Sequence, residues 1–209
     1  MIDSNCYQAF NGLGKLFFGE KRNEEAIKYL NKTIKVNPYY SWSHSNKGTV
    51  LFSLNNKKEA VESWNLAIKL DQNNHLAYNN LGYYFYKKGR LEDAISNYSE
   101  AIRSNPDYIC AYINKGVSFN KKGKYDDAIE YYTNAIRVDP NYDPAYYSIG
   151  CILLDNKKHE ESIKYFYGAI SIKPTNPTYY QTLAIALEEI GRKEEAMECY
   201  NKAIESKNN

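Results

Sequence analysis

The nine residues LGYYFYKKG, Leu81 to Gly89, decide the fold because they recur along the chain at a fixed distance. Moved forward by 34 residues they align with KGVSFNKKG, Lys115 to Gly123, and after a second step with IGCILLDNK, which begins at Ile149. A fixed period of this length is typical of repeat proteins. The same frame predicts a short lead-in (1–6) and a single array (7–209) of six repeats without insertions: 7–40, 41–74, 75–108, 109–142, 143–176 and 177–209.

Within each repeat, numbered here from position 1 to position 34, a few positions keep the same kind of residue. Position 8 is small in every repeat: Gly14, Gly48, Gly82, Gly116, Gly150 and Ala184. Position 20 is also small: Ala26, Ala60, Ala94, Ala128, Ser162 and Ala196. Position 24 is large: Leu30, Trp64, Tyr98, Tyr132, Phe166 and Tyr200. Position 28 is always isoleucine: Ile34, Ile68, Ile102, Ile136, Ile170 and Ile204.

Each repeat is predicted to form two helices. In repeat 3 the first helix is expected over about 76–88 and the second over about 91–104, because apolar residues recur there at steps of three and four. Gly89 is suited to the left-handed conformation that ends a helix, and Pro106 stops the second helix. Since the connecting turns are short, neighbouring helices should be antiparallel. The sequence therefore predicts an all-α fold.

At these residues the chain resembles the tetratricopeptide repeat family. The family pattern is seen in repeat 3 as Tyr78, Leu81, Gly82, Phe85, Ala94, Tyr98, Ala101 and Pro106. The resemblance extends over all six repeats, with departures at Thr33, His44 and Gln72. It implies a right-handed superhelical α-solenoid of stacked antiparallel helix pairs, with the first helix of each pair on the concave wall.

Three packing expectations follow. Gly82 should allow close approach of the partner helix at Ala94, and the isoleucine at position 28, for example Ile102, should be buried. Lys47 and Lys115 stand where an aliphatic residue is usual, so their stems should pack while their ammonium groups reach water.

The resemblance assigns positions 2, 5, 6, 9, 12 and 13 to the concave wall, and position 6 there carries three successive asparagines. An asparagine amide has one acceptor and two donors, so it can bind a peptide backbone whatever its side chains, while neighbouring rings bind side chains. The predicted peptide-binding residues are the ladder Asn46, Asn80 and Asn114, together with Asn11, Lys15, Trp42, Thr49, Phe52, Asn79, Tyr83, Tyr86, Ile113, Val117 and Tyr147. Asparagine is common throughout this chain, so a solvated helix face is the competing interpretation.

The leading functional hypothesis is a non-enzymatic module that binds an extended peptide or protein segment. The alternatives are a self-assembling structural scaffold and the substrate-recruiting region of a larger enzyme. Repeats of this family that bind the carboxylate of a chaperone tail use a lysine at position 5. Here position 5 carries no lysine, so that clamp is not expected: Asn11, Ser45, Asn79, Ile113, Tyr147 and Gln181.

Composition makes other classes of function unfavourable. The formal net charge is only +2, which argues against nucleic acid or anionic membranes as partners. The cysteines Cys6, Cys110, Cys151 and Cys199 and the histidines His44, His75 and His159 form no motif for metal binding or nucleophilic catalysis. No cofactor is expected, and the N-terminus lacks the pattern of a signal peptide, which favours a cytoplasmic location.

The sixth repeat reaches the end of the sequence with no further helix to cover it. We therefore expect Leu183 and Leu187 to be partly uncovered and this end to favour self-association.

Overall fold

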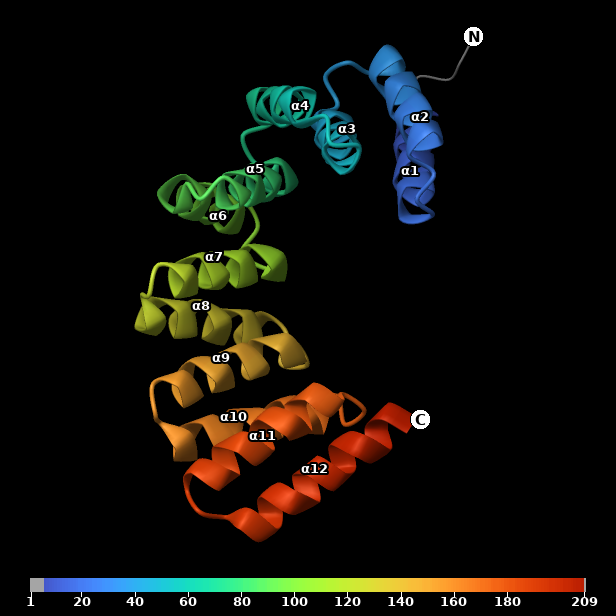
Figure 1. Cartoon of the computed structure of the whole chain (residues 1–209). Helices are drawn as coiled ribbons and strands as arrows, with labels where there is room; N and C mark the ends of the chain where they lie inside the picture. The colour runs from blue at the N-terminus through green and yellow to red at the C-terminus, as the bar shows by residue number, and fades with distance from the viewer. Residues whose placement is uncertain (1–5, 209) are drawn as a thin grey trace. The chain divides into compact units, whose positions relative to one another are not determined.

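The computed structural model describes residues 6–208, with side chains through residue 206. Twelve α-helices and no strand form this part of the chain (Figure 1). Residues 1–5 of the predicted lead-in lie outside the described residues, and Cys6 begins the first helix. The helices are α1 (Cys6–Gly19), α2 (Asn23–Val36), α3 (Ser41–Ser53), α4 (Lys57–Leu70), α5 (His75–Lys87), α6 (Leu91–Ser104), α7 (Ile109–Lys121), α8 (Tyr125–Val138), α9 (Asp143–Asp155), α10 (His159–Ile172), α11 (Pro177–Glu189) and α12 (Lys193–Asn208).

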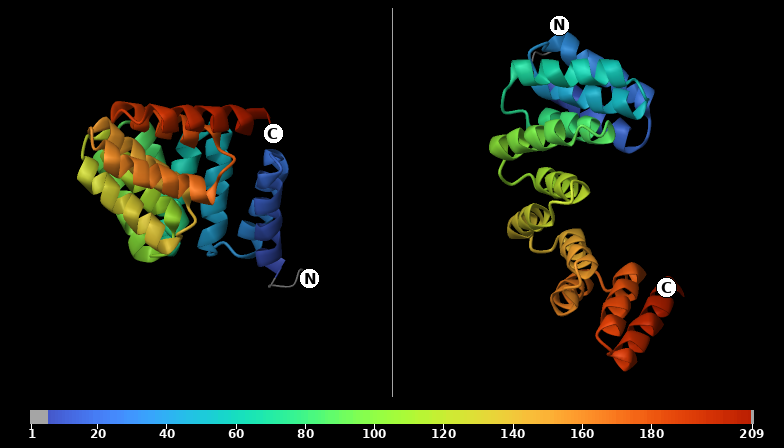
Figure 2. Two further views of the ribbon diagram at one scale, coloured as in Figure 1. Left: turned by 90° about the horizontal axis from the view of Figure 1, so that it is seen from below. Right: turned by 60° about the vertical axis from the view of Figure 1, so that its left-hand side comes forward.

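The chain forms two compact units, an N-terminal unit that ends at Ala111 and a C-terminal unit that begins at Tyr112. In the N-terminal unit, α1 packs on α2, α3 on α4 and α5 on α6, and α2 also contacts α3 as α4 contacts α5 (Figure 2). In the C-terminal unit, α9 packs on α10 and α11 on α12, with the same contacts between successive pairs. The prediction of an all-α solenoid of stacked helix pairs is confirmed.

The turn inside each repeat has one backbone conformation throughout. Position 15 is left-handed in all six repeats, with φ between 60° and 79°, at Lys21, Asn55, Gly89, Gly123, Lys157 and Gly191. The next N–H donates to the carbonyl five residues earlier, as from Arg90 to Phe85 at 3.0 Å, which satisfies the end of the first helix. Glycine fits this conformation without strain, so the three non-glycine residues are held there at some cost.

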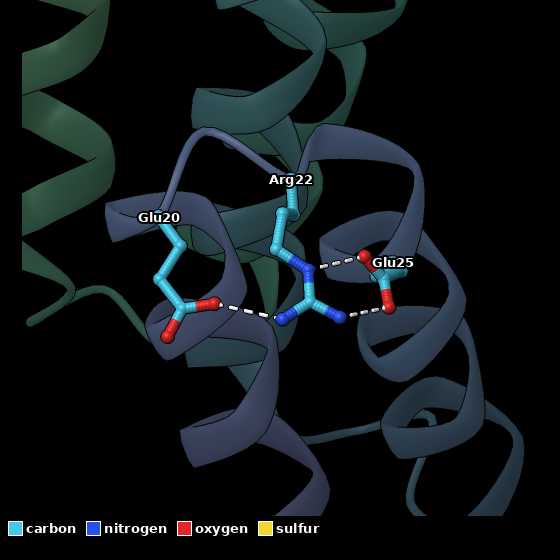
Figure 3. A network of polar contacts seen from close by, with 3 residues as sticks. All are labelled: Glu20, Arg22 and Glu25. Atoms are coloured by element: carbon cyan, nitrogen blue, oxygen red, sulfur yellow. Dashed lines mark hydrogen bonds and ion pairs between the residues drawn. The ribbon is translucent and has the colours of Figure 1, made fainter.

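Arginines at position 16 reinforce three of these turns. The Arg22 guanidinium donates to Glu25 at the start of α2 and to Glu20 (Figure 3). Arg90 and Arg192 make the equivalent bonds to Asp93 and Glu195. The arginine holds the pKa of the Glu25 carboxyl below its usual value, because the charged carboxylate accepts its hydrogen bonds. These pairs are exposed to solvent, so they orient the turn more than they stabilise it.

The turn between repeats is closed by a side chain that sequence analysis overlooked. At position 31 the side-chain oxygens of Asn37, Asp71, Asn105 and Asp139 each accept a hydrogen bond from the N–H two residues later, at 2.9–3.1 Å. Asparagine and aspartate favour such turns because their short side chains reach their own backbone.

The small residue at position 8 accommodates the ring at position 24. A Cβ atom added to Gly82 would lie 2.6 Å from Cε1 of Tyr98, a buried ring in the partner helix. The expected partner was Ala94, which is buried, but the atoms nearest to a Cβ at Gly82 belong to Tyr98, one helical turn further along. Gly48, Gly116 and Gly150 meet Trp64, Tyr132 and Phe166 in the same way. Each of the first five helix pairs is thus built around one large buried side chain.

The isoleucine at position 28 is less buried than expected. The residue before it, at position 27, is the one that is almost fully enclosed: Thr33, Ala67, Ala101, Ala135, Ala169 and Ala203. Ile102 and its four counterparts in repeats 1, 2, 4 and 5 are half-buried, whereas Ile204 is 60% exposed. Position 28 is one residue further around the helix than position 27 and lies at the junction with the next repeat. Its burial therefore depends on whether a next repeat covers it.

Two further expectations need correction. Lys115 is more buried than expected, and its Nζ lies 4.2 Å from the centre of the Tyr131 ring, a contact that stabilises the ammonium group. Leu183 and Leu187 are fully buried, because α12 and the residues of repeat 5 cover them. The apolar side chains that are exposed in repeat 6 are others, Ile185 in α11 and Met197 and Ile204 in α12.

Candidate peptide-binding pocket

The N-terminal unit contains a pocket between the first helices of its repeats. Its volume is about 280 Å³. Most of its lining residues occupy the positions that the family resemblance assigns to the concave wall: Lys15, Phe18, Gly19, Asn46, Thr49, Leu76 and Asn80. Gly14, Leu30 and Val50 complete the lining from the core of the helix pairs. Four predicted site residues, Lys15, Asn46, Thr49 and Asn80, are thus brought together.

The asparagines of this pocket are held by hydrogen bonds between successive repeats. Nδ2 of Asn46 donates to Oδ1 of Asn11 at 2.9 Å, and Nδ2 of Asn80 donates to Oγ1 of Thr49 at 2.9 Å. Each bond uses one of the two amide hydrogens and leaves the side-chain oxygen as an acceptor. Asn46 and Asn80 are half-buried, so their amides are fixed in place and still partly accessible. Asn11 and Asn79 are buried.

Two of the predicted aromatic residues of the N-terminal unit, Trp42 and Phe52, contact rings of the next repeat. Trp42 packs edge-on against His75, with ring centres 5.1 Å apart. Phe52 lies between Trp64 and Tyr83, at 5.6 and 6.0 Å. Tyr83 is 38% exposed and Tyr86 is half-buried. Trp42 and Phe52 therefore contribute to packing between repeats, and Tyr83 presents the more accessible ring.

Four predicted site residues lie in the C-terminal unit. Ile113, Asn114 and Val117 are half-buried on α7, and they belong to a different unit from the pocket. Tyr147 contacts the rings of Phe166 and Tyr179, and its hydroxyl lies 3.2 Å from Oγ1 of Thr182. Burial raises the pKa of Tyr147, so the phenol stays neutral. The ladder predicted from the sequence is thus divided, with Asn46 and Asn80 at the pocket and Asn114 in the C-terminal unit.

Charge around the pocket comes from Lys15, whose side chain is exposed at its edge. The other lining residues are uncharged, and Leu30, Val50 and Leu76 among them are apolar. Sequence analysis did not single out Phe18 or Leu76, although both stand at positions of the predicted wall, 12 and 2. Their apolar character was the available signal of a binding residue, because a residue on the concave wall is not needed to pack the core.

The part of the chain that the structure describes was also searched for metal sites, disulfides and membrane-spanning helices. Residues 6–208 contain no cluster of three or more histidine, cysteine, aspartate or glutamate side chains that could hold a metal ion. All four cysteines are free. None of the helices described has the length and apolar character needed to cross a bilayer.

Comparison with known proteins identifies the repeats. Family models described as tetratricopeptide repeat match residues 7–40, 109–142, 143–176 and 177–209, and a model described as TPR repeat matches 48–89 and 82–123. A search of curated proteins gave no match.

Among solved structures, PilF of Pseudomonas aeruginosa is similar with a TM-score of 0.83 and 19% identity, over 93% of this chain and 88% of that one. MamA is similar with a TM-score of 0.71 and 25% identity, over 77% and 94%. YrrB, described as a TPR protein with an unusual peptide-binding site, is similar with a TM-score of 0.68 and 20% identity, over 86% and 93%. The six repeats, their shared turns and these matches lead to one conclusion: the chain belongs to the tetratricopeptide repeat family.

Proposed function

We propose that this protein is a non-enzymatic interaction module, and that its N-terminal unit binds an extended peptide segment across the first helices α1, α3 and α5. The observation that carries the proposal is the pocket of about 280 Å³ that Asn46 and Asn80 line together with the apolar Leu30, Val50 and Leu76. Proteins of this family act in protein–protein interactions. YrrB is similar in fold only, so the peptide-binding assignment rests on the residues of this chain.

The size of the pocket favours a peptide side chain over a small molecule. Sites for drug-sized ligands usually enclose about 300–1,000 Å³, and this pocket is at the lower limit of that range. A single apolar side chain of an extended segment would contact Leu30, Val50 and Leu76. The amides of Asn46 and Asn80 would then bind the backbone on either side of that anchor.

Lys15 gives the proposed ligand a second feature. Its ammonium group is the charge at the edge of the pocket, so an acidic residue next to the apolar anchor is favoured. Because Lys15 is exposed, salt should weaken this preference more than it weakens binding of the anchor. The proposed ligand is therefore a segment with an acidic residue beside an apolar one.

The test begins with a displayed library of random 12-residue peptides selected on the 209-residue chain. A selected peptide is then titrated by calorimetry against a double variant, Asn46→Ala with Asn80→Ala. Each amide should contribute about 0.5–1.5 kcal/mol, so the pair should lose roughly 2 kcal/mol, about thirtyfold in affinity. Lys15→Glu should weaken only peptides that contain the acidic residue.

The matched control is Asn31→Ala with Asn65→Ala, two exposed asparagines on the second helices α2 and α4. This control should bind normally. Since Asn46 and Asn80 also bond within the protein, the double variant should melt at a slightly lower temperature, and binding is compared well below it. Equal affinity of the double variant and the control would refute the proposed site.

A further inference from the structure

Successive repeats pack through the same few positions. In the N-terminal unit, Ala77 and Leu81, at positions 3 and 7, are buried in a cluster with Trp64 and Ile68 of the preceding repeat. In the C-terminal unit, Leu183 and Ala186, at positions 7 and 10, pack with Ile163, Phe166 and Ile170 of repeat 5. Each repeat therefore has a leading face at positions 3, 7 and 10 and a trailing face at positions 21, 24 and 28.

The leading face of repeat 1 is exposed where its counterparts are covered. Leu16, at position 10, is 56% exposed, whereas the residues at position 10 in repeats 2 and 5, Val50 and Ile152, are 1% and 3% exposed. Ala9, at position 3, is exposed, and its equivalents are buried in all five later repeats. Leu13 completes this face and is half-buried. An apolar surface of the kind that receives a preceding repeat is thus accessible.

The trailing face of repeat 6 is exposed in the corresponding way. Ile204 is 60% exposed and Met197 is 63% exposed, whereas Ile163, the equivalent of Met197 in repeat 5, is 4% exposed. Tyr200 is half-buried, although the large residue at position 24 is buried in repeats 1 to 5. The trailing face of repeat 6 and the leading face of repeat 1 should fit each other, because they consist of the same positions that pack together between successive repeats inside the chain.

The charges of the two end repeats are opposite in sign. Repeat 1, residues 7–40, carries six basic and three acidic side chains, and repeat 6, residues 177–209, carries four basic and six acidic ones. A contact between these repeats would be attractive, whereas a contact between two copies of repeat 6 would be repulsive. Charge therefore favours a head-to-tail arrangement over a symmetric one.

We propose that the chain assembles head to tail, with the trailing face of repeat 6 in one copy packed on the leading face of repeat 1 in a second copy. Leu16 and Leu13 would contact Ile204 and Tyr200, as position 10 and position 7 contact positions 28 and 24 inside the array. Such a contact is heterologous, so each added copy presents a new free face. This proposal does not depend on the peptide-binding pocket.

The test uses the 209-residue chain in sedimentation velocity over a range of concentrations. The wild type should increase in mass with concentration. Leu16→Glu and Ile204→Glu should each weaken self-association more than about tenfold, because either places a charge in an apolar junction. The control Leu66→Glu changes a residue of α4 that is 40% exposed and belongs to neither face, and it should associate like the wild type. Circular dichroism verifies that each variant is folded.

A mixture of the two variants gives the decisive result. The Leu16→Glu chain keeps an intact trailing face and the Ile204→Glu chain keeps an intact leading face, so the mixture should form a one-to-one dimer and nothing larger. A wild type that stays monomeric at every concentration would overturn the proposal. So would self-association of Leu16→Glu alone, which would indicate a symmetric contact, or a mixture that does not dimerise.

Discussion

At the scale of single residues, the first five repeats depend on the absence of a side chain at position 8. At Gly48 an added Cβ would lie 2.6 Å from Nε1 of Trp64 and 2.9 Å from the carbonyl oxygen of Ala60. The Trp64 ring cannot move freely, because it is buried and its Nε1 donates to the carbonyl of Ser45 at 3.2 Å. Helix propensity alone favours alanine over glycine, so the close packing determines the residue.

We therefore expect Gly48→Ala to destabilise the N-terminal unit by about 1–3 kcal/mol, the usual cost of overpacking a core. Gly12→Ala is the matched control, since Gly12 is also inside a first helix but has no atom within 4 Å of an added Cβ. Gly12→Ala should raise the free energy of unfolding by about 0.5–1 kcal/mol. Urea unfolding followed by Trp fluorescence measures both. Similar effects of the two substitutions would mean that position 8 is set by helix propensity.

At the scale of elements, the turn between two helices fixes how they pair. Lys157 is held at φ 60° between α9 and α10, where glycine occupies three of the six equivalent turns. Lys157→Gly should stabilise the C-terminal unit by about 0.5–1 kcal/mol, because the relief of about 1–2 kcal/mol of left-handed strain outweighs the entropy that glycine adds to the unfolded chain. Thermal unfolding by circular dichroism measures the change.

The control for this turn is Lys164→Gly, at an exposed position inside α10. There the substitution should lower the free energy of unfolding by about 1 kcal/mol, because glycine has a lower helix propensity than lysine. The two substitutions remove the same side chain from the same repeat, so opposite signs would identify backbone conformation as the cause. If both destabilise, the left-handed residue is not strained.

At the scale of the whole molecule, stability should be local. The core cluster around Phe166 lies entirely in the C-terminal unit, and the cluster around Trp64 lies entirely in the N-terminal unit. Phe166→Ala should cost about 3–5 kcal/mol in its own unit. In arrays of repeats, such losses decrease with distance along the chain.

Amide hydrogen exchange can measure this directly. Protection should fall strongly in α9 to α12 of the Phe166→Ala variant and much less in α1 to α4. The converse variant, Trp64→Ala, should reverse the pattern. An equal loss of protection in both units would show that the 209 residues unfold as one cooperative body.

The sequence was sufficient for the period, the helix pairs and the turn at Gly89, because these depend on local residues that repeat six times. It was not sufficient for the partner of Gly82. Ala94 and Tyr98 both lie on the apolar face of the second helix, and only the separation of the helices selects the ring. The exposure of Ile204 depends on a neighbouring repeat. In the pocket, spacing placed Asn46 and Asn80 on one wall, but their bonds to Asn11 and Thr49 depend on side-chain orientation.

Identical junction positions also mean that the array can change length in whole repeats. Suppose that residues 41–74 were lost as one 34-residue segment. Leu30 and Ile34 of repeat 1 would then contact Ala77, Leu81 and Tyr84, the same residues that pack with Trp64 and Ile68 now. No compensating substitution is required at the new boundary, because the trailing face of one repeat already fits the leading face of another. Unequal recombination between repeats would therefore yield shorter or longer proteins that still fold, so copy number is a heritable variable on which selection can act.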